Sequence, residues 1–307
     1  MPDIAYSNQE ISLLTVLDLI GNTPLVELKN LNPNPESRIF AKLEGQNPAG
    51  SVKDRPACFM IKGALERGEL SSGKKFIEAT SGNTGIALAM IARQFGLDIE
   101  LVMPEGSTEE RIKTMRAFGA TVFLTAREHG IEGSIDYVNE KMASGDYVML
   151  NQFANPDNPR AHFETTGPEI WRATNGRITH FVASMGTTGT IMGTGRYLKR
   201  KNAKIKIIGV QPEQGSAIPG IRNWPAEYVP KIFDPSGVDD IRYVSQRIAV
   251  DMTRRLARDE GIFAGMSSGG AAFIALQLAG EIDHGTIVFI VCDRGDRYLS
   301  TDLFAGS

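Results

Sequence analysis

The residue with the clearest capacity for covalent chemistry is Lys53, which lies in the turn-rich segment NPAGSVKDR at positions 47–55. Pro56 is favoured in a first helical turn, and the apolar residues at positions 57–65 have helical spacing. This pattern places Lys53 at the start of a helix, where the helix dipole favours the neutral amine. A neutral lysine is a nucleophile that can form a Schiff base with an aldehyde. The alternative is an ordinary solvated lysine, so the neighbouring loops must discriminate between the two.

A polar loop, TSGNTG, occupies positions 80–85 between an expected strand and an expected helix. Its glycines allow a tight turn, and its hydroxyl and backbone N–H groups can surround a small anion. A plain helix N-terminus needs only one capping side chain, here from Ser81, Asn83 or Thr84. Because the loop carries more polar groups than capping requires, we predict that it binds a carboxylate.

A second loop, GTTGT at positions 186–190, again joins an expected strand to an expected helix. Backbone N–H groups at a helix N-terminus, together with hydroxyls, form a phosphate site that needs no cationic side chain. The spacing of these glycines with Gly193 and Gly195 differs from the dinucleotide fingerprint, and the lysine of a P-loop is missing. We therefore predict a phosphate-binding loop and disfavour an NAD-dependent dehydrogenase or a nucleoside triphosphate enzyme.

A third loop, GMSSGG at positions 265–270, precedes a helix expected from Ala271. One of its two serines, Ser267 or Ser268, is expected to cap that helix, which leaves the other free to turn its hydroxyl into the cleft. A Schiff-base lysine, a phosphate loop and a carboxylate loop together describe a site for pyridoxal phosphate and an amino acid.

The segments that position these loops alternate between strand and helix, which implies parallel sheets covered by helices on both faces. Ligands bind such sheets beyond the carboxyl ends of the strands, where these loops lie. Proline-containing turns at 151–160 mark a candidate crossing between two lobes, and the irregular segment 214–240 is expected to be a functional loop. Strands are expected at 23–28, 39–44, 75–79, 99–103, 121–124, 147–150, 179–183, 205–210 and 286–291, and helices at 13–20, 57–65, 84–95, 109–118, 131–142, 163–173, 191–199, 247–260 and 271–279.

The composition of the 307-residue chain is that of a globular protein, with 42% hydrophobic residues and a formal net charge of −3. That charge argues against a general nucleic-acid binder. The polar first nine residues show no secretory signal, and the apolar runs are too short to span a membrane. Cys58, Cys292 and the four histidines lack the spacing of a disulfide framework or a metal site. We expect a soluble, cytoplasmic, metal-free protein without nucleic-acid or membrane partners.

Nearly the whole chain, from IGNTPL at 20–25 to YLST at 298–301, resembles the fold-type II pyridoxal-phosphate enzymes, and among them the cysteine synthases, or O-acetylserine sulfhydrylases. The segments NPAGSVKDR, NPDNP at 155–159 and CDRGDRY at 292–298 are most similar to the B-type isozyme. The resemblance implies a tryptophan synthase β-like α/β fold with two lobes, each an open, mostly parallel sheet flanked by helices. It further implies a smaller, mobile, substrate-gripping domain at 46–154 and a larger phosphate-binding domain formed by 1–45 and 155–307.

The resemblance also implies roles for individual positions. Lys53 matches the lysine that holds pyridoxal 5′-phosphate as an internal aldimine and later moves the α-proton, and Asn83 matches the partner of the cofactor's 3′-oxygen. Ser267 matches the hydroxyl beside the pyridine nitrogen, with Ser268 as the alternative. The phosphate loop corresponds to Gly186, Thr187, Thr188, Gly189 and Thr190, and the grip on the substrate carboxylate to Thr80, Ser81, Thr84 and Gln152.

The implied reaction is a β-replacement: O-acetyl-L-serine loses acetate to give an α-aminoacrylate, and sulfide or thiosulfate adds to yield L-cysteine or S-sulfocysteine. A neutral serine at the pyridine nitrogen makes the ring a weaker electron sink than an aspartate would, which favours replacement over transamination. Arg222 is either a contact for an anionic sulfur donor or a solvated loop residue, since Asn223 stands where similar proteins often carry a second arginine. Cys292 either lies near the site or is a buried small apolar residue.

Several alternatives remain at this stage. An O-phosphoserine sulfhydrylase, a cystathionine β-synthase or a serine or threonine dehydratase would keep the lysine and the glycine-rich loops, although no heme or regulatory domain is evident. A dehydrogenase is disfavoured by the glycine spacing. A non-catalytic scaffold for serine acetyltransferase is possible for A-type relatives, and the B-type similarity argues against such a complex. The resemblance implies a homodimer, which is also the commonest form of oligomer.

Overall fold

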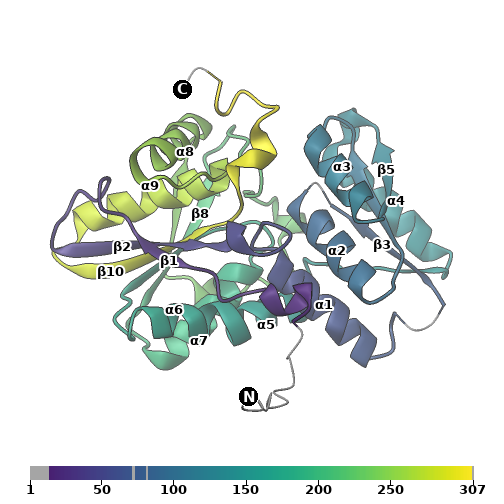
Figure 1. Cartoon of the computed structure of the whole chain (residues 1–307), viewed down its shortest axis with the longest axis horizontal. Helices are drawn as coiled ribbons and strands as arrows, with labels where there is room; N and C mark the ends of the chain where they lie inside the picture. The colour runs from purple at the N-terminus through teal and green to yellow at the C-terminus, as the bar shows by residue number, and fades with distance from the viewer. Residues whose placement is uncertain (1–13, 71–72, 81, 306–307) are drawn as a thin grey trace, which may run out of the picture.

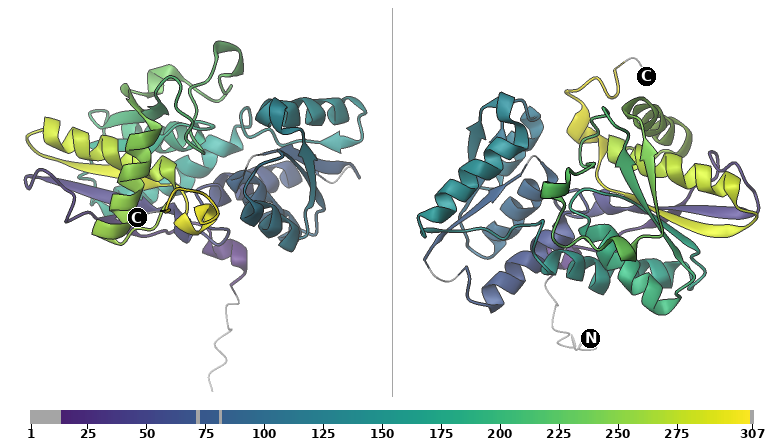
Figure 2. Two further views of the ribbon diagram at one scale, coloured as in Figure 1. Left: turned by 90° about the horizontal axis from the view of Figure 1, so that it is seen from above. Right: turned by 180° about the vertical axis from the view of Figure 1, so that it is seen from behind.

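The computed structural model describes residues 14–70, 73–80 and 82–305. These residues form two lobes, each built around one sheet, and the lobes lie side by side (Figures 1 and 2). The four-stranded sheet lies within residues 75–148, whereas the six-stranded sheet takes its strands from both ends of the sequence. Both sheets are mostly parallel and are covered by helices, which confirms the predicted α/β class.

The smaller lobe, on the right of Figure 1, is a parallel sheet with helices packed on it. Its elements are α1 (Asp54–Glu66), β3 (Lys75–Ala79), α2 (Asn83–Gln94), β4 (Ile99–Pro104), α3 (Glu109–Ala117), β5 (Thr121–Thr125), α4 (Gly130–Ala143) and β6 (Tyr147–Val148). The strand order is β5-β4-β3-β6, so β3 lies inside the sheet. α1 packs against α2 of this lobe and against α5 (Asp157–Ala161) of the other, so it joins the two.

The larger lobe has its strands in the order β1-β2-β10-β7-β8-β9. Its elements are β1 (Leu25–Glu27), β2 (Ser37–Leu43), α5, α6 (Gly167–Ala173), β7 (His180–Ser184), α7 (Gly189–Lys201), β8 (Lys206–Pro212), β9 (Asp240–Val244), α8 (Gln246–Glu260), α9 (Met266–Glu281) and β10 (Gly285–Val291). The edge strand β1 runs antiparallel to β2, and the other neighbouring strands of this sheet are parallel. α8 and α9 lie on one side of the sheet, and α5, α6 and α7 on the other (Figure 1).

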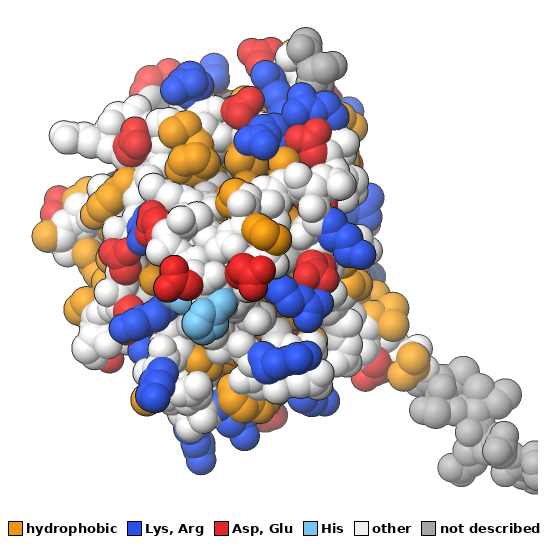
Figure 3. All heavy atoms as spheres, turned by 90° about the vertical axis from the view of Figure 1, so that its left-hand side faces the viewer, with side chains coloured by type: hydrophobic (Ala, Val, Ile, Leu, Met, Phe, Trp, Pro, Cys, Tyr) orange, Lys and Arg blue, Asp and Glu red, His pale blue; other side chains and the backbone are white. Residues whose placement is uncertain are grey.

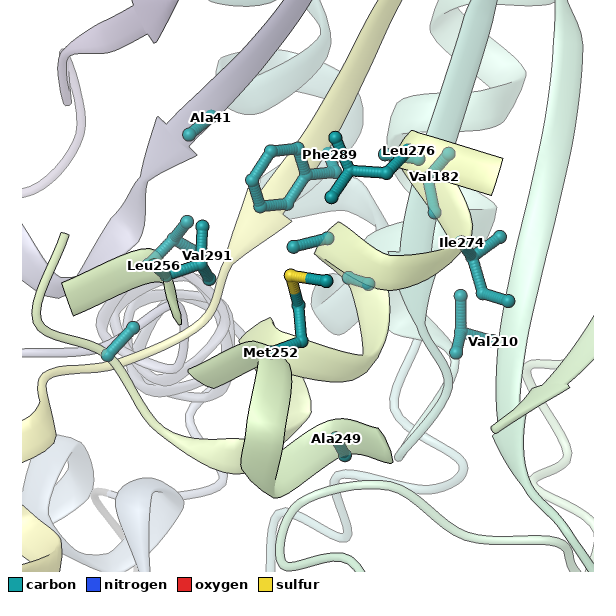
Figure 4. Close-up of a cluster of buried hydrophobic side chains, with 14 of the residues drawn as sticks. Ala41, Val182, Val210, Ala249, Met252, Leu256, Ile274, Leu276, Phe289 and Val291 are labelled. Carbon is teal, nitrogen blue, oxygen red and sulfur yellow. The ribbon is translucent and has the colours of Figure 1, made fainter. Parts of the chain in front are cut away.

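The core of the larger lobe is built around α9, whose composition is apolar on all sides. Such a helix is stable only when it is covered all round. Ala275 and Ala279 of α9 are fully buried, and α9 is enclosed between α8 and the strands β10, β7 and β2. Figure 4 shows the surrounding side chains, with Phe289 from β10, Val182 from β7 and Met252 from α8 directed into one cluster. This packing holds the N-terminus of α9 rigidly beside the carboxyl ends of the strands.

In the larger lobe one strand was not predicted, and the expected start and capping of one helix were wrong. β9 was missed because its sequence, DIRYV, mixes charged and apolar residues, as suits an edge strand that pairs only with β8. α9 begins at Met266 rather than at Ala271, so Ser267 and Ser268 lie in its first turn and not in a preceding loop. Gly265 is the N-cap, so the predicted capping by one of these serines was also wrong.

Two other helices differ from their expected bounds. The helix expected at 163–173 begins at Asp157 and continues through a π-helical segment, His162–Thr166, into α6. Prolines in a first helical turn do not break the helix, which explains why the helix starts within the NPDNP segment at 155–159. The helix expected at 13–20 is a short 3₁₀ helix, Val16–Leu19, and residue 13 lies outside the described residues.

The face on the left of Figure 1 carries acidic and basic side chains interspersed with isolated apolar ones (Figure 3). Such a surface shows no extended patch of one charge sign on that face. In the described parts of the chain, none of the helices combines the length and the apolar character needed to cross a lipid bilayer. The first nine residues, used above for the localisation prediction, lie outside the described residues.

Candidate active site

A cavity of about 1000 Å³ is lined by residues of both lobes at the carboxyl ends of their strands. The predicted site residues that line it are Lys53, Thr80, Asn83, Thr84, Gln152, Gly186, Thr187, Thr190, Arg222, Ser267 and Cys292. Thr188 and Gly189 are buried in the same loop as Gly186 but do not line the cavity. Ser81 lies outside the described residues. Loops from distant parts of the sequence therefore meet at one cavity.

Lys53 is the N-cap of α1 and reaches the cavity from the turn that precedes this helix. The Asp54 carboxylate accepts a hydrogen bond from Ala49 N at 2.6 Å, which closes that turn. Burial lowers the pKa of Lys53, and the neighbouring Cys292 and Asp293 partly oppose this shift. The amine is thereby biased toward the neutral, nucleophilic form that the sequence analysis anticipated.

Cys292, at the end of β10, lies beside Lys53 and lines the cavity. Burial raises the pKa of the Cys292 thiol to about 11, although the nearby Lys53 lowers it. The thiol is therefore protonated near neutral pH and is a poor nucleophile. Its backbone N–H donates to Ser268 Oγ at 2.9 Å. Ser268 is thus engaged with the chain, whereas Ser267 lines the cavity.

The loop between β3 and α2 is closed by the hydroxyl of Thr80. Thr80 Oγ1 accepts from Gly85 N at 3.1 Å, and Gly82 occupies the N-cap position of α2 without a capping side chain of its own. Thr80 therefore takes the capping function that had been considered for its neighbours. Thr84 Oγ1 donates to Gln152 Oε1 at 2.7 Å, which joins this loop to the turn after β6.

The side-chain amide of Asn83 is held at both ends by residues near the C-terminus. Its Nδ2 donates to Asp293 Oδ2 at 2.6 Å, and its Oδ1 accepts from Arg297. The Tyr298 hydroxyl donates to the same Asp293 oxygen at 2.7 Å. Asp293, Arg297 and Tyr298 were not predicted to support Asn83, although the CDRGDRY segment that contains them carried part of the resemblance.

The phosphate loop fits a bound anion. Thr188 adopts a left-handed backbone, φ 69°, immediately before the N-terminus of α7, and its buried Oγ1 has no partner among the described residues. A Cβ on Gly189 would lie 1.9 Å from Asn158 Oδ1, and one on Gly186 would lie 2.6 Å from Gly220 O. Only glycine fits at these two positions. The helix N-terminus and the unpaired hydroxyl suit the phosphate of pyridoxal phosphate.

His162, in the π-helical segment, supports this loop and was not identified from the sequence. Its Nε2 lies 3.2 Å from Thr190 Oγ1 and its Nδ1 lies 2.9 Å from Thr166 Oγ1. Burial lowers the pKa of His162 to about 3, and the Arg55 guanidinium adds to this shift. A neutral imidazole therefore positions Thr190 at the edge of the cavity.

Arg222 lies at the mouth of the cavity, between the lobes. Its guanidinium is 3.5 Å from Glu132 Oε1 on α4 and 5.2 Å from the centroid of the Trp224 ring. Trp224 Nε1 donates to Gly186 O at 2.8 Å and thereby ties this segment to the phosphate loop. The Arg222 side chain is 38% exposed, so it can meet a ligand that enters from solvent.

A buried cluster of ion pairs fixes α1 directly after Lys53. Arg55 Nε is 2.6 Å from Glu44 Oε2, and Arg55 Nη1 is 2.7 Å from Glu169 Oε1. Lys42 Nζ is 2.6 Å from Glu169 Oε2. Burial by itself would raise the pKa of Glu44, but the Arg55 guanidinium and the Lys42 ammonium lower it to about 2. The cluster therefore joins β2, α1 and α6 through charged groups.

The sequence matches the family described as pyridoxal-phosphate dependent enzyme over residues 16–293. A cysteine synthase B from Pseudomonas aeruginosa is 54% identical over 290 residues, which cover 94% of this chain and 97% of the relative. A solved cysteine synthase (OASS) from Entamoeba histolytica has a TM-score of 0.91 at 39% identity and covers 100% of this chain and 95% of that one. An O-acetylserine dependent cystathionine β-synthase from Helicobacter pylori has a TM-score of 0.87 at 38% identity, over 95% and 99% of the two chains. The chain therefore belongs to the pyridoxal-phosphate dependent enzyme family and, within it, to the cysteine synthase group.

Proposed function

We propose that this protein catalyses β-replacement on O-acetyl-L-serine, with sulfide or thiosulfate as donor, to form L-cysteine or S-sulfocysteine and acetate. One observation carries the proposal: a lysine amine with a lowered pKa shares a cavity with a phosphate loop and with the hydrogen-bonded pair Thr84 and Gln152. The similarity to cysteine synthase B from Pseudomonas aeruginosa supports the B type of this activity.

In this proposal separate groups of residues bind the cofactor, bind the substrate carboxylate and transfer the proton. When bound, pyridoxal phosphate withdraws electrons from the amino acid's α-carbon, so that the α-proton and the β-acetoxy group can leave. The phosphate loop from Gly186 to Thr190 would hold the phosphate, while Asn83 and Ser267 would bind the ring. The carboxylate of the amino acid is gripped by Thr80, Ser81, Thr84 and Gln152. Lys53 would hold the cofactor when no substrate is bound and, once free, would move the α-proton.

Two features favour replacement over side reactions. The neutral Ser267 hydroxyl near the ring does not enforce a positive pyridine, which disfavours transamination. Cys292 has a raised pKa, so its protonated thiol does not compete with the sulfur donor at the β-carbon. Closure of the smaller lobe over the cavity would exclude water from the reacting groups.

The test is the visible absorption spectrum of the purified protein with pyridoxal phosphate bound. O-acetylserine is expected to change the spectrum, and each sulfur donor to restore it at a rate that ranks the donors. A spectrum that does not respond to O-acetylserine would refute the substrate assignment and leave the cofactor assignment intact. O-phosphoserine and serine, offered in the same assay, test the other members of the class.

A cystathionine-forming β-replacement is the second candidate. It is favoured by the likeness to the O-acetylserine dependent enzyme from Helicobacter pylori and by a cavity of about 1000 Å³, which has room for a thiol larger than sulfide. Homocysteine added after O-acetylserine distinguishes the two candidates. Restoration of the spectrum faster by homocysteine than by sulfide or thiosulfate would favour the second.

Arg222 is proposed to attract an anionic donor at the mouth of the cavity. Arg222→Gln should raise the KM for thiosulfate by on the order of 10-fold, because a charged contact is lost, and should change the KM for sulfide less. Steady-state kinetics with both donors measure the difference. Arg196→Gln, on the solvent side of α7, is the matched control. Equal changes in both KM values would contradict the assignment.

We also propose that the protein is a homodimer and that residues 46–154 form the mobile domain. Light scattering after size exclusion should give twice the 33.4 kDa chain mass. A pull-down with the tail of serine acetyltransferase should be negative if the B-type similarity holds for partners. The cytoplasmic location stays a prediction from the sequence.

A further inference from the structure

Glu78 is a buried carboxylate in the middle of the smaller lobe that the mechanism above does not use. It lies on β3, two residues before Thr80, and is 2% exposed. Burial raises the pKa of Glu78 to about 7, while hydrogen bonds from backbone N–H groups of residues 150–152 oppose the shift. Carboxylates are rarely buried without specific partners, so these backbone partners identify what the side chain holds.

The partners of Glu78 belong to the turn that follows β6. β6 pairs with β3 only through Lys75 and Phe76, and the strand ends at Val148. Leu150 N and Asn151 N each donate to Glu78 Oε2 at 3.2 Å. The carboxylate thus accepts hydrogen bonds from two backbone N–H groups that follow the end of β6, and it fixes this segment to β3.

This turn presents Gln152 to the cavity. Asn151 has a left-handed backbone, φ 52°, and Asn155 N donates to Asn151 O at 2.9 Å, so the turn is tight. Gln152 then meets the Thr84 hydroxyl at 2.7 Å. On its other side, Gln152 O accepts from Asn158 Nδ2 of the larger lobe at 2.7 Å. Two side chains therefore tie this turn to the smaller lobe: Thr84 binds the side chain of Gln152, and Glu78 binds the backbone of the turn.

We propose that Glu78 is a positioning residue for the substrate carboxylate. It fixes the turn of Gln152 to β3, the strand that leads into Thr80 and Thr84, and so holds Gln152 in a constant position relative to these two threonines. The inference rests on the proposed function and deepens it. Its effect falls mainly on the amino-acid substrate, because Glu78 itself contacts neither the phosphate loop nor Arg222, and the turn of Gln152 reaches the phosphate loop indirectly, through Asn158.

Three variants of the cofactor-loaded enzyme test this assignment. Glu78→Met has nearly the same length but no comparable acceptor, and it should raise the KM for O-acetylserine by on the order of 10-fold, with the KM for sulfide changed less than about 2-fold. Glu78→Gln can place its carbonyl oxygen where Oε2 lies and should restore the KM to within about 3-fold of wild type. Glu78→Asp keeps the carboxyl group but shortens the side chain by one methylene, and should give an intermediate KM for O-acetylserine.

Asp157→Asn is the control, since Asp157 is also a buried carboxylate but binds Arg67 at 2.8 Å and not the turn of Gln152. It should lower the melting temperature without changing the ratio of the two KM values. An unchanged O-acetylserine KM in folded Glu78→Met, or equal increases in both KM values, overturns the assignment. If Glu78→Met does not fold, Glu78→Asp decides by the same criterion. Absence of turnover in the wild type with O-acetylserine would refute the proposed function itself, which separates the two failures.

Discussion

Lys53 owes its reactivity to a balance between burial and nearby groups. Desolvation favours the neutral amine, whereas the Asp293 carboxylate favours the ammonium. The balance suits a group that must be a nucleophile in one step and carry a proton in another. Asp293 is itself held by Asn83 and Tyr298, so the charge that opposes desolvation has a fixed position.

Lys53→Ala should reduce turnover by on the order of 1,000-fold or more, because both the covalent attachment and the proton transfer are lost. Borohydride treatment followed by mass spectrometry should no longer find the cofactor fixed to the chain. Lys62→Ala, an exposed lysine on the same helix, should behave like wild type in both assays. Normal turnover of Lys53→Ala would contradict the central assignment.

The phosphate loop depends on the absence of a side chain at Gly189. Gly189→Ala would place a Cβ 1.9 Å from Asn158 Oδ1, and Asn158 cannot retreat without losing its bonds to Gln152 O and Thr187 Oγ1. We expect the affinity for pyridoxal phosphate to fall by about 10-fold or more, as measured by equilibrium titration of the cofactor-free protein. Gly280→Ala, where a Cβ would meet nothing within 4 Å, should leave that affinity unchanged. Equal affinities in the two variants would show that the loop tolerates the side chain.

At the scale of elements, the start of α1 is held by the cluster of Glu44, Arg55, Glu169 and Lys42 as well as by the burial of its apolar residues. Arg55 and Glu44 have no exposed side-chain surface, and the Thr23 hydroxyl also donates to Glu44 at 2.6 Å. Charges buried at this depth must remain paired. The cluster therefore fixes the register of α1 against β2 and α6, and with it the position of the lysine.

Glu44→Gln should lower the free energy of unfolding at pH 7 by about 3 kcal/mol, because it leaves part of the Arg55 charge unpaired. The pKa of Glu44 is lowered from 4.5 to about 2 in the folded protein, so its contribution is present above pH 4.5 and is lost as the pH falls toward 2. The difference between wild type and variant should therefore narrow in acid, as measured by urea unfolding at several pH values. Glu164→Gln, in an exposed pair with Arg160, should change stability by less than about 0.5 kcal/mol. A difference that stays constant with pH would contradict the assignment to Glu44.

At the scale of the whole molecule, the site is divided between two lobes, and the polar contacts between them include partly buried ones, such as that of Asn83 with Asp293, and exposed ones. Ser300 Oγ donates to Glu110 Oε2 at 2.8 Å, and the Arg222 guanidinium lies 3.5 Å from Glu132. The exposed contacts contribute little to stability, so they would not oppose the proposed motion of the smaller lobe. A lobe motion would carry Thr84 toward the phosphate loop and exclude water from the cavity.

Small-angle X-ray scattering of Lys53→Ala loaded with pyridoxal phosphate should show a smaller radius of gyration when O-acetylserine is added, because the variant binds the amino acid and cannot complete the reaction. Acetate alone, which lacks the amino-acid portion, should leave the radius unchanged. An unchanged radius at saturating O-acetylserine would contradict the proposed mobility of residues 46–154.

The sequence by itself was sufficient for the α/β class, the family and the loops at 80–85 and 186–190 that meet Lys53 at one cavity. Each of these follows from short-range patterns: strand and helix periods, glycines where a loop enters a helix, and a proline one turn after the lysine. The same short range explains the errors. The segment DIRYV forms β9 because it pairs with β8, a strand remote from it in local pattern. Ser267 lies within α9 because tertiary packing encloses this helix from its first turn.

Only the tertiary structure decided which side chains support the loops. Asn83 meets Asp293 and Arg297 across the chain, and Glu78 meets the turn of Gln152, because parallel sheets bring the carboxyl ends of remote strands together. A local pattern cannot specify such pairs, since a polar residue in a strand looks the same whether its partner is water or a backbone N–H more than one element away. The chemistry was therefore determined by residues visible in the sequence, and its geometry by burial that exists only in the folded chain.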